Sequence, residues 1–435
     1  VFERIREEYL KSGRIANAIA TGYKKAYSAI FDSNLTTIIA ALILLQFDSG
    51  PIKGFAITLI IGIISSMFTA LFLTKLFFMG WVRNKKNTKL HMSNIIKKTH
   101  FNFLKFGKIS IYSCIFICLA SGFLLVSKNL PILGIDFTGG YSATIELTPK
   151  KDMDYKSAVA SALYKAGLSP QEVKIRTMTP PNNMKILLSN SLDQNNQIFA
   201  KMPIETAKSP KGFIYEKNPR LNWLVDTLKK ENIQISNETL QDLHTQWTSI
   251  GTQMSSAMKL NAILGLSIAL LCILVYITVR FEFKYAISAT ICLAIDVGVT
   301  LALIIVLNAL GLSVQIDLNT IAALMTIVGY SLNDTIIIFD RIREDIKSSK
   351  KIPFTDIVNA ALNVTLSRTI MTSSTTLIVL IALLTLGGSA IFGLSLVMVI
   401  GVLFGTFSSL FIAAPLLIFF QKNENKSISR IELRQ

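Results

Sequence analysis

The stretch at residues 320–344 carries polar groups that could do chemistry, because Asn333, Asp334 and Thr335 interrupt an apolar run. A carboxylate at the centre of a bilayer costs about 2.5–3.5 kcal/mol on insertion scales, so it needs a compensating partner or a protonatable role. Asp334 precedes Asp340, where a charged run begins, by six residues, which is about 9 Å along a helix. We therefore place Asp334 inside the membrane and predict that it binds a proton or ion. The alternative is a capping or packing role.

Arg368 is the candidate partner of Asp334. It opens a second polar stretch, in which six hydroxyl residues, among them Thr369 and Thr372, fall within eight positions. Hydroxyl groups at that density hydrogen-bond across helices or line a wet path for protons or ions. A positive anchor at the membrane rim is the alternative role for Arg368. Asp296 is a second acid near the middle of an apolar stretch, and it either supports the relay or packs within the bundle.

Composition sets the class of protein in which these residues work. Hydrophobic residues make up 51% of 435, charged residues 16%, and the mean hydropathy is +0.50. These values indicate a polytopic membrane protein and not a soluble enzyme. The net charge is +17, but nine Lys and Arg and no acid fall at residues 75–108, between two apolar stretches. That placement is typical of a cytoplasmic loop, so we expect no nucleic-acid partner.

Metal and nucleotide chemistry are not expected. The four cysteines fall within apolar stretches without metal-ligand spacing, and the three histidines stand alone. The sequence also lacks a Walker A motif and a plausible catalytic triad. We therefore predict no metal, no cofactor and no enzymatic hydrolysis.

Eight apolar stretches approach or exceed the length needed to cross a bilayer. They fall at residues 30–47, 53–79, 107–127, 258–279, 284–307, 317–338, 368–386 and 391–419. Residues 1–28 are predicted to form a cytoplasmic amphipathic helix, although residues 1–7 do not have the pattern of a helix start. In the stretch that carries Asp334, residues 329–331 are predicted to interrupt the helix. Basic loops and an even number of spans place both ends in the cytoplasm.

Residues 129–256 differ from the rest because their polarity is mixed. Strands are predicted at 141–148, 172–177 and 184–188, and helices at 155–166 and 221–230. This alternation indicates a small α+β extracytoplasmic domain. Residues 190–220, which are rich in Asn, Lys and Pro, are predicted to be a surface insertion.

An internal repeat relates the two ends of the chain. FERIRE at 2–7 matches FDRIRE at 339–344, and TT at 36–37 matches TT at 375–376. Gly62 and Phe68 then match Gly401 and Phe407. Both copies run in the same order, which predicts a parallel repeat about an axis along the membrane normal, with a site at the repeat interface. We expect the first copy's counterpart of the Asp334 stretch to lie upstream of Val1.

Longer motifs resemble the SecD and SecF proteins of the bacterial export machinery, which belong to the resistance-nodulation-division (RND) superfamily. GIDFTGG at 134–140, RFEFKYA at 280–286, GYSLNDTIIIFDRIRE at 329–344 and SRTIMTSSTTL at 367–377 are similar to SecF. FERIREE at 2–8, NLTT at 34–37 and GPIKGFAITLIIGIISSMFTA at 50–70 are similar to the end of SecD.

The resemblance implies a division into five parts. These are the end of a SecD-like half (1–90), a SecF-like cytoplasmic segment and first span (91–128), a periplasmic domain (129–256), a five-span bundle (257–421) and a basic cytoplasmic tail (422–435).

The resemblance also implies a function. The family assists the Sec translocon in the bacterial cytoplasmic (inner) membrane, using the proton-motive force and no cofactor. Expected partners are the SecYEG channel, YajC, YidC, the translocating preprotein and membrane lipids. Asp334 and Arg368 match the family's membrane aspartate and its accompanying arginine. The segment that leaves the membrane for the periplasmic domain matches at Asp136, Phe137, Thr138, Gly139 and Gly140.

Two other functions remain open at this stage. An RND-type exporter of small molecules or lipids would share the repeat and the membrane acid. In a purely structural translocon subunit, Asp334 and Arg368 would only hold helices together. One departure from the family pattern concerns Asp296, because Ile295 precedes it where the family often has His.

Overall fold

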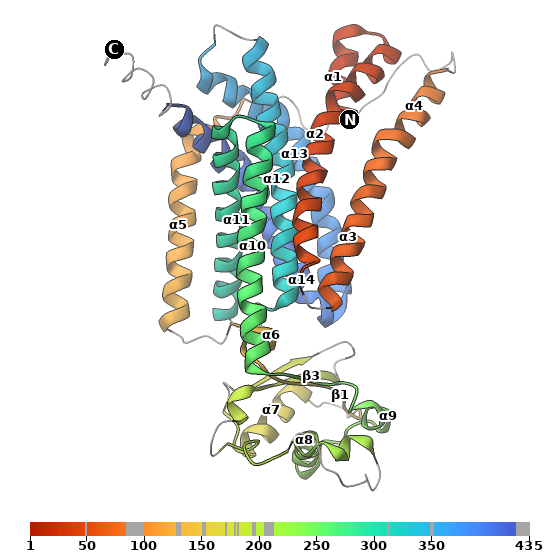
Figure 1. Cartoon of the computed structure of the whole chain (residues 1–435), viewed down its shortest axis with the longest axis vertical. Coiled ribbons are helices and arrows are strands. Elements are labelled where there is room, and N and C mark those ends of the chain that lie inside the picture. Colours follow the sequence, from red (N-terminus) through yellow and green to blue (C-terminus); the bar gives the residue numbers. More distant parts are fainter. Residues whose placement is uncertain are drawn as a thin grey trace.

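A bundle of long helices stands on a small sheet domain in the computed structural model of the chain (Figure 1). The structure describes residues 1–47, 50–83, 100–127, 132–149, 154–169, 172–177, 180, 182–193, 197–203, 213–310, 314–348 and 352–422. Most of the predicted basic loop (84–99) and nearly all of the basic tail (423–435) lie outside these residues. The end of the bundle away from the sheet domain is called the distal end below.

Eight helical segments are long and apolar enough to cross a membrane, which confirms the predicted number of spans. They are α2 (Ile15–Leu44), α3 (Gly50–Phe68) continued by η1 (Thr69–Leu73) and α4 (Thr74–Arg83), α5 (Phe103–Ser127), α10 (Thr252–Arg280), α11 (Phe283–Ala309), α12 (Leu318–Ser348), α13 (Phe354–Leu386), and α14 (Gly388–Ser408) continued by η4 (Ser409–Ala413). The chain is therefore a polytopic α-helical membrane protein.

Helix α12 is the centre of the bundle. Its most apolar window is 83% buried, against 17% for the windows of α5 and α13. It packs against α2, α11, α13 and α14. The helix is continuous from Leu318 to Ser348, so the predicted interruption at 329–331 is wrong. Gly329 instead lets α2 approach closely, because a Cβ there would lie 2.8 Å from Thr37 Cγ2.

The N-terminal region also differs from the prediction of one amphipathic helix at 1–28. Helix α1 (Phe2–Ser12) begins within the segment from which no helix start was expected, and α2 begins at Ile15. Gly13 separates them with φ 63°, a left-handed conformation that ends a helix readily only at glycine. Ile5 is fully buried against α2, where Gly22 leaves room for it. Burial of this side chain folds α1 back onto α2.

The parallel repeat is visible in the helix irregularities. The π-helical segment η1 follows Phe68 directly, and its counterpart η4 begins two residues after Phe407, the repeat partner of Phe68. Isolated π-turns are rare, so the same irregularity at equivalent positions supports the register read from the sequence.

The sheet domain, residues 140–250, is built on an antiparallel sheet with strand order β2-β3-β1-β4. The strands are β1 (Gly140–Glu146), β2 (Val173–Thr177), β3 (Asn183–Ser189) and β4 (Trp247–Ile250), with helices α7 (Tyr155–Lys165), α8 (Pro219–Lys230) and α9 (Asn237–Asp242). Helices α7 and α8 lie on the side of the sheet away from the bundle (Figure 1). The three predicted strands and two predicted helices are confirmed, whereas β4 and α9 were not predicted.

The prediction of a surface insertion at 190–220 is wrong for the described part of that segment. Leu192 and Phe199 are fully buried and Tyr215 is 3% exposed, all within the core of the sheet domain. Arg220 donates to Tyr141 Oη and forms an ion pair with Asp193 at 2.9 Å. The apolar side chains of this segment are widely spaced among polar ones, so they show neither a helical nor a strand periodicity from which their burial could be predicted.

Candidate functional site

Asp334 lies in the buried middle of α12. Its side chain is 5% exposed, and none of the described residues gives its carboxyl group a hydrogen bond or an ion pair. Of its neighbours, Asn333 is half-buried, and Thr335 is buried and donates to the carbonyl oxygen of Ser331 at 3.3 Å. Asp334 is thus buried within a candidate membrane span, and its carboxyl group has no direct partner among the described residues.

Arg368 does not form the predicted ion pair with Asp334. Because α13 begins at Phe354, Arg368 stands well inside the helix and does not open it. The two side chains are close enough to attract each other electrostatically, but no ion pair joins them in the described part of the chain. Arg368 instead lines a cavity formed by charged and apolar side chains, and Thr369 beside it is buried.

The hydroxyl groups of α13 divide into two sets. Thr372 Oγ1 donates to backbone carbonyl oxygens of its own helix, Arg368 O at 3.1 Å and Thr369 O at 3.0 Å. Two others bridge helices: Tyr330 Oη of α12 donates to Thr376 Oγ1 at 3.0 Å, and Thr406 Oγ1 of α14 donates to Ser373 Oγ at 2.7 Å. The hydroxyl-rich stretch therefore joins α13 to both neighbouring helices near Asp334.

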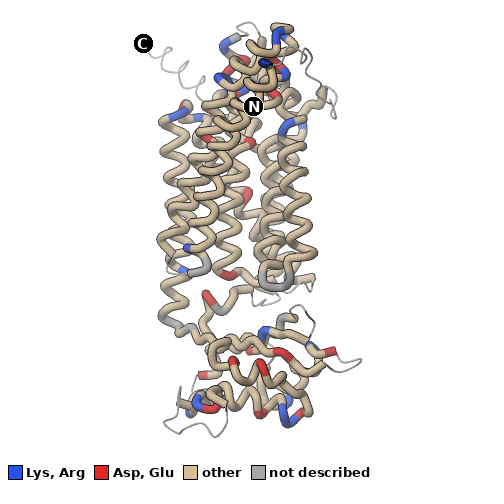
Figure 2. The backbone as a smooth tube through the Cα atoms, turned by 90° about the vertical axis from the view of Figure 1, so that its right-hand side faces the viewer, with Lys and Arg blue, Asp and Glu red and all other residues tan. Residues whose placement is uncertain are grey.

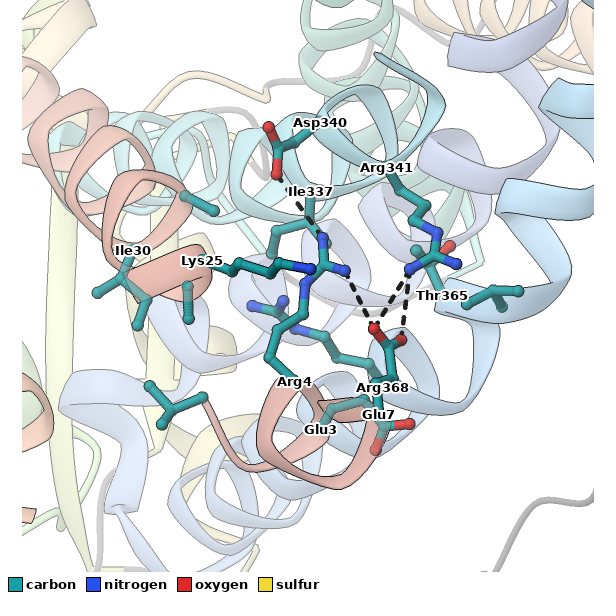
Figure 3. Close-up of a pocket in the computed structure, with 14 residues that line it drawn as sticks. Glu3, Arg4, Glu7, Lys25, Ile30, Ile337, Asp340, Arg341, Thr365 and Arg368 are labelled. Carbon is teal, nitrogen blue, oxygen red and sulfur yellow. Dashed lines mark hydrogen bonds and ion pairs between the residues drawn. The ribbon is translucent and has the colours of Figure 1, made fainter. Parts of the chain in front are cut away.

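The cavity that Arg368 lines lies at the distal end of the bundle, between α1, α2, α12 and α13 (Figure 3). Its empty space, open solvent included, is about 550 Å³. Arg4, Glu7, Asp340 and Arg341 also line it. Arg368, which is half-buried, lines this mixed-charge opening together with Asp340, which follows Asp334 by six residues toward the distal end of α12.

The two copies of the repeated charged motif bind each other at this cavity. Arg4 and Arg341 occupy equivalent positions, as do Glu7 and Glu344. Arg4 pairs with Glu344 at 2.6 Å, and Arg341 pairs with Glu7 at 3.3 Å. Each arginine also faces the glutamate of its own motif, at 3.0 Å in the first copy and 3.9 Å in the second. The pairing is reciprocal, as expected for two parallel copies around one axis.

A second buried charge was missed in the sequence. Asp32 of α2 is 5% exposed and accepts hydrogen bonds from Tyr276 Oη at 2.9 Å and Arg280 Nε at 2.7 Å. Ser28 Oγ adds a donor at 3.2 Å. This cluster ties the distal end of α10 to α2. The signal in the sequence was an acid close to the start of an apolar stretch.

Asp296 of α11 is fully buried. Its Oδ2 accepts a hydrogen bond from Ser331 of α12, whereas its Oδ1 has no partner among the described residues. Both carboxyl groups therefore involve α12. Asp334 is a residue of that helix, and Asp296 accepts a hydrogen bond from one of its side chains.

The segment that connects the bundle to the sheet domain also contacts α12. Helix α6 (Ile135–Thr138) holds Asp136, whose Oδ2 accepts from the first amide of α12, Leu318 N, at 3.0 Å. Gly134 N donates to Ile316 O at 2.8 Å just before that helix. An acidic side chain at a helix N-terminus satisfies a free amide and interacts favourably with the helix dipole.

The rest of this motif shapes the entry into the sheet. Phe137 is buried, and Thr138 Oγ1 donates to Gly134 O at 3.0 Å. Gly139 and Gly140 have φ of 72° and 133°, conformations that favour glycine. At Gly140 a Cβ would lie 2.3 Å from Leu188 O, so β1 pairs closely with β3 only without a side chain there.

These features define a class of protein: a polytopic helical membrane protein with a parallel repeat, ionisable groups at the repeat interface and an α+β domain on one side. The chain belongs to the SecD/SecF family, because the model described as "Protein export membrane protein SecD/SecF, C-terminal" matches residues 1–84 and 230–423.

Relatives with curated names agree. Protein translocase subunit SecDF of Brucella abortus is 29% identical over 432 residues, which cover 97% of this chain and 51% of the relative. Protein translocase subunit SecF of Rhodobacter capsulatus is 32% identical over 333 residues, covering 76% and 92%. The chain thus spans about half the length of the SecDF relatives and nearly all of this SecF.

Solved structures match over the whole chain. The crystal structure of SecDF from Thermus thermophilus, named a translocon-associated membrane protein, gives a TM-score of 0.77 at 26% identity, covering 97% of this chain and 52% of that one. SecDF in a super-membrane-facing form gives a TM-score of 0.68 at 26% identity, covering 99% and 53%. The fold of this chain is therefore similar to that of about half of the SecDF chain.

Proposed function

We propose that this chain serves the Sec preprotein translocase as an ion-gradient-coupled subunit that promotes protein export across the bacterial inner membrane. The observation that carries the proposal is Asp334, an acid buried in the central helix of the bundle, to which no described residue supplies a direct counter-charge. Burying a charged carboxylate in that position costs free energy, so protonation or deprotonation of Asp334 changes the free energy of the bundle substantially.

Protonation of Asp334 would alternate with attraction to Arg368. The neutral acid suits the packing described here, in which the two groups do not touch. Loss of the proton toward the distal cavity creates a charge that attracts Arg368 and favours closer packing of α12 and α13. One charge moved across 100 mV is worth about 2.3 kcal/mol, enough to shift a two-state helix bundle. The coupling ion in this proposal is the proton, and no cofactor takes part.

Movement of α12 would reach the sheet domain through two rigid connections. Asp136 bonds to the first amide of the same helix that carries Asp334. In addition, Gly251 is the only residue between β4 and α10, whose far end is held by Asp32. Repacking in the bundle therefore changes the position of the domain that would contact the preprotein.

Charge distribution supports an orientation. Lys and Arg gather at the distal end of the bundle and are sparse along the spans (Figure 2). By the positive-inside rule the distal end faces the cytoplasm, and the sheet domain is periplasmic. Expected partners are SecYEG, with YajC and YidC, the preprotein and surrounding lipids.

Export into inverted membrane vesicles tests the proposal, with and without an ionophore that collapses the proton gradient. Asp334→Asn should assemble normally and lose only the ionophore-sensitive part of export. Asp356→Asn, which removes an exposed acid at the start of α13, is the matched control and should behave like the wild type. Full ionophore-sensitive export by Asp334→Asn would leave only a structural role for that residue.

A further inference from the structure

Asp296 lies where three helices meet. Ser331 of α12 donates to its Oδ2, and Ser408, at the end of α14, lies near it while its hydroxyl donates to Gly405 O at 3.1 Å. The carboxyl group is fully buried, and its Oδ1 is left without a hydrogen-bond partner in the described part of the chain. No ion pair to Asp296 is formed by the described residues.

The surroundings of Asp296 favour the neutral acid. The titratable groups that face it are the thiols of Cys292, one turn away on α11, and Cys114 of α5. Among the described residues, the polar groups that α12 and α14 bring to Asp296 are the hydroxyls of Ser331 and Ser408. A charged carboxylate that accepts one hydroxyl hydrogen bond and faces no cation retains most of its desolvation cost, whereas a neutral carboxyl group loses only a single hydrogen bond at the unpaired oxygen.

We propose that Asp296 is a second proton-binding carboxyl group of the bundle, coupled to Asp334 through Ser331. This inference rests on the proposed function, since it assigns a second proton to the same cycle. Uptake of one proton at Oδ1 forms an O–H bond and cancels the charge, while Oδ2 continues to accept from Ser331. Release returns the proton to water and leaves the carboxylate.

Ser331 makes the two carboxyl groups dependent on each other. It stands three residues before Asp334 on α12, so any rotation of the helix that moves Asp334 also moves the donor to Asp296. Space on the other side is limited, because a Cβ at Gly405 of α14 would lie 3.0 Å from Ser331 Cβ. A change at Asp334 is thus transmitted to the hydrogen bond of Asp296, and the reverse also holds.

Infrared difference spectroscopy of the full chain in lipid nanodiscs tests the proposal, with the carbonyl stretch of a protonated carboxyl group as the readout. At neutral pH, Asp296→Asn should remove one such band, and Ser331→Ala should shift it. Ser395→Ala, which deletes another fully buried hydroxyl of α14, should leave it in place. In Asp334→Asn the pH at which the band titrates should change.

The proposal fails if no protonated-carboxyl band depends on Asp296, or if its titration is the same in wild type and Asp334→Asn. Asp296→Glu guards against misfolding of the amide variant, because it should replace the band with a shifted one. Export that ignores the proton gradient would overturn the proposed function but leave this band unchanged, so the two failures are distinguishable.

Discussion

The reciprocal ion pairs at the distal cavity allow a quantitative prediction. Arg4 and Glu344 approach to 2.6 Å, with side chains 16% and 36% exposed. Two unit charges about 4 Å apart attract by about 4 kcal/mol at an effective dielectric constant of about 20. Screening by water and the cost of ordering two long side chains offset most of this. We expect a coupling energy of about 1–2 kcal/mol, between the values of exposed and buried pairs.

A double-mutant cycle measures that coupling. Arg4→Gln, Glu344→Gln and the double variant are unfolded reversibly in mixed micelles, and the non-additive part of the free energy is the pair's contribution. Lys165–Glu231 of the sheet domain is the matched control, because it has the same 2.6 Å separation but side chains 63% and 36% exposed. Its coupling should stay below about 0.5 kcal/mol.

The reciprocal pair repeats the test within the same protein. Arg341 and Glu7 are 3.3 Å apart, with side chains 18% and 21% exposed. Their coupling should be of the same size as that of the first pair, since both have similar burial. Additive effects in both cycles would refute the reasoning, as would a coupling in only one of them, because the argument depends on the equivalence of the two copies.

Three further predictions concern other contacts. Asp32→Asn should lower the unfolding free energy by about 1 kcal/mol, because the Arg280 side chain that loses its carboxylate is 41% exposed and stays in contact with solvent; thermal unfolding in detergent measures this. Lys25 Nζ donates to Glu8 at 2.8 Å and lowers the pKa of that carboxyl group. This bond stabilises the fold above the ordinary pKa of a glutamate and is lost as the pH falls through the folded-state pKa, so Lys25→Gln should destabilise at neutral pH but not in strong acid. Asp136→Ala should cost about 1 kcal/mol as a lost helix cap and increase hydrogen exchange at the start of α12; unchanged exchange there would contradict the capping role.

Hydropathy was sufficient to predict the spans, because each must present about 20 apolar residues whatever it packs against. It placed their ends poorly where a helix continues beyond the bilayer. Helix α13 begins at Phe354, fourteen residues before Arg368, so an arginine predicted to open a span stands within a helix. Where the exposed turns of a long helix are formed by polar residues, hydropathy does not show that the helix continues through them.

The repeat was readable from the charged motifs, but the contacts between its copies were not. Nothing in the spacing indicates that Arg4 binds Glu344 and not only its own Glu7, since the two partners are 340 residues apart. The bond between Asp32 and Arg280 spans 248 positions and was missed for the same reason. Pairing between distant segments depends on helix packing, which a single sequence leaves open.

The central claim, that Asp334 binds and releases the coupling proton, is tested most directly by proton flux. The protein is reconstituted into liposomes that enclose a pH-sensitive dye, and a pH gradient with a membrane potential is imposed. Wild type and Asp356→Asn should acidify the lumen at the same rate, and Asp334→Asn should reduce the flux to that of protein-free liposomes. Equal flux in wild type and Asp334→Asn would contradict the account.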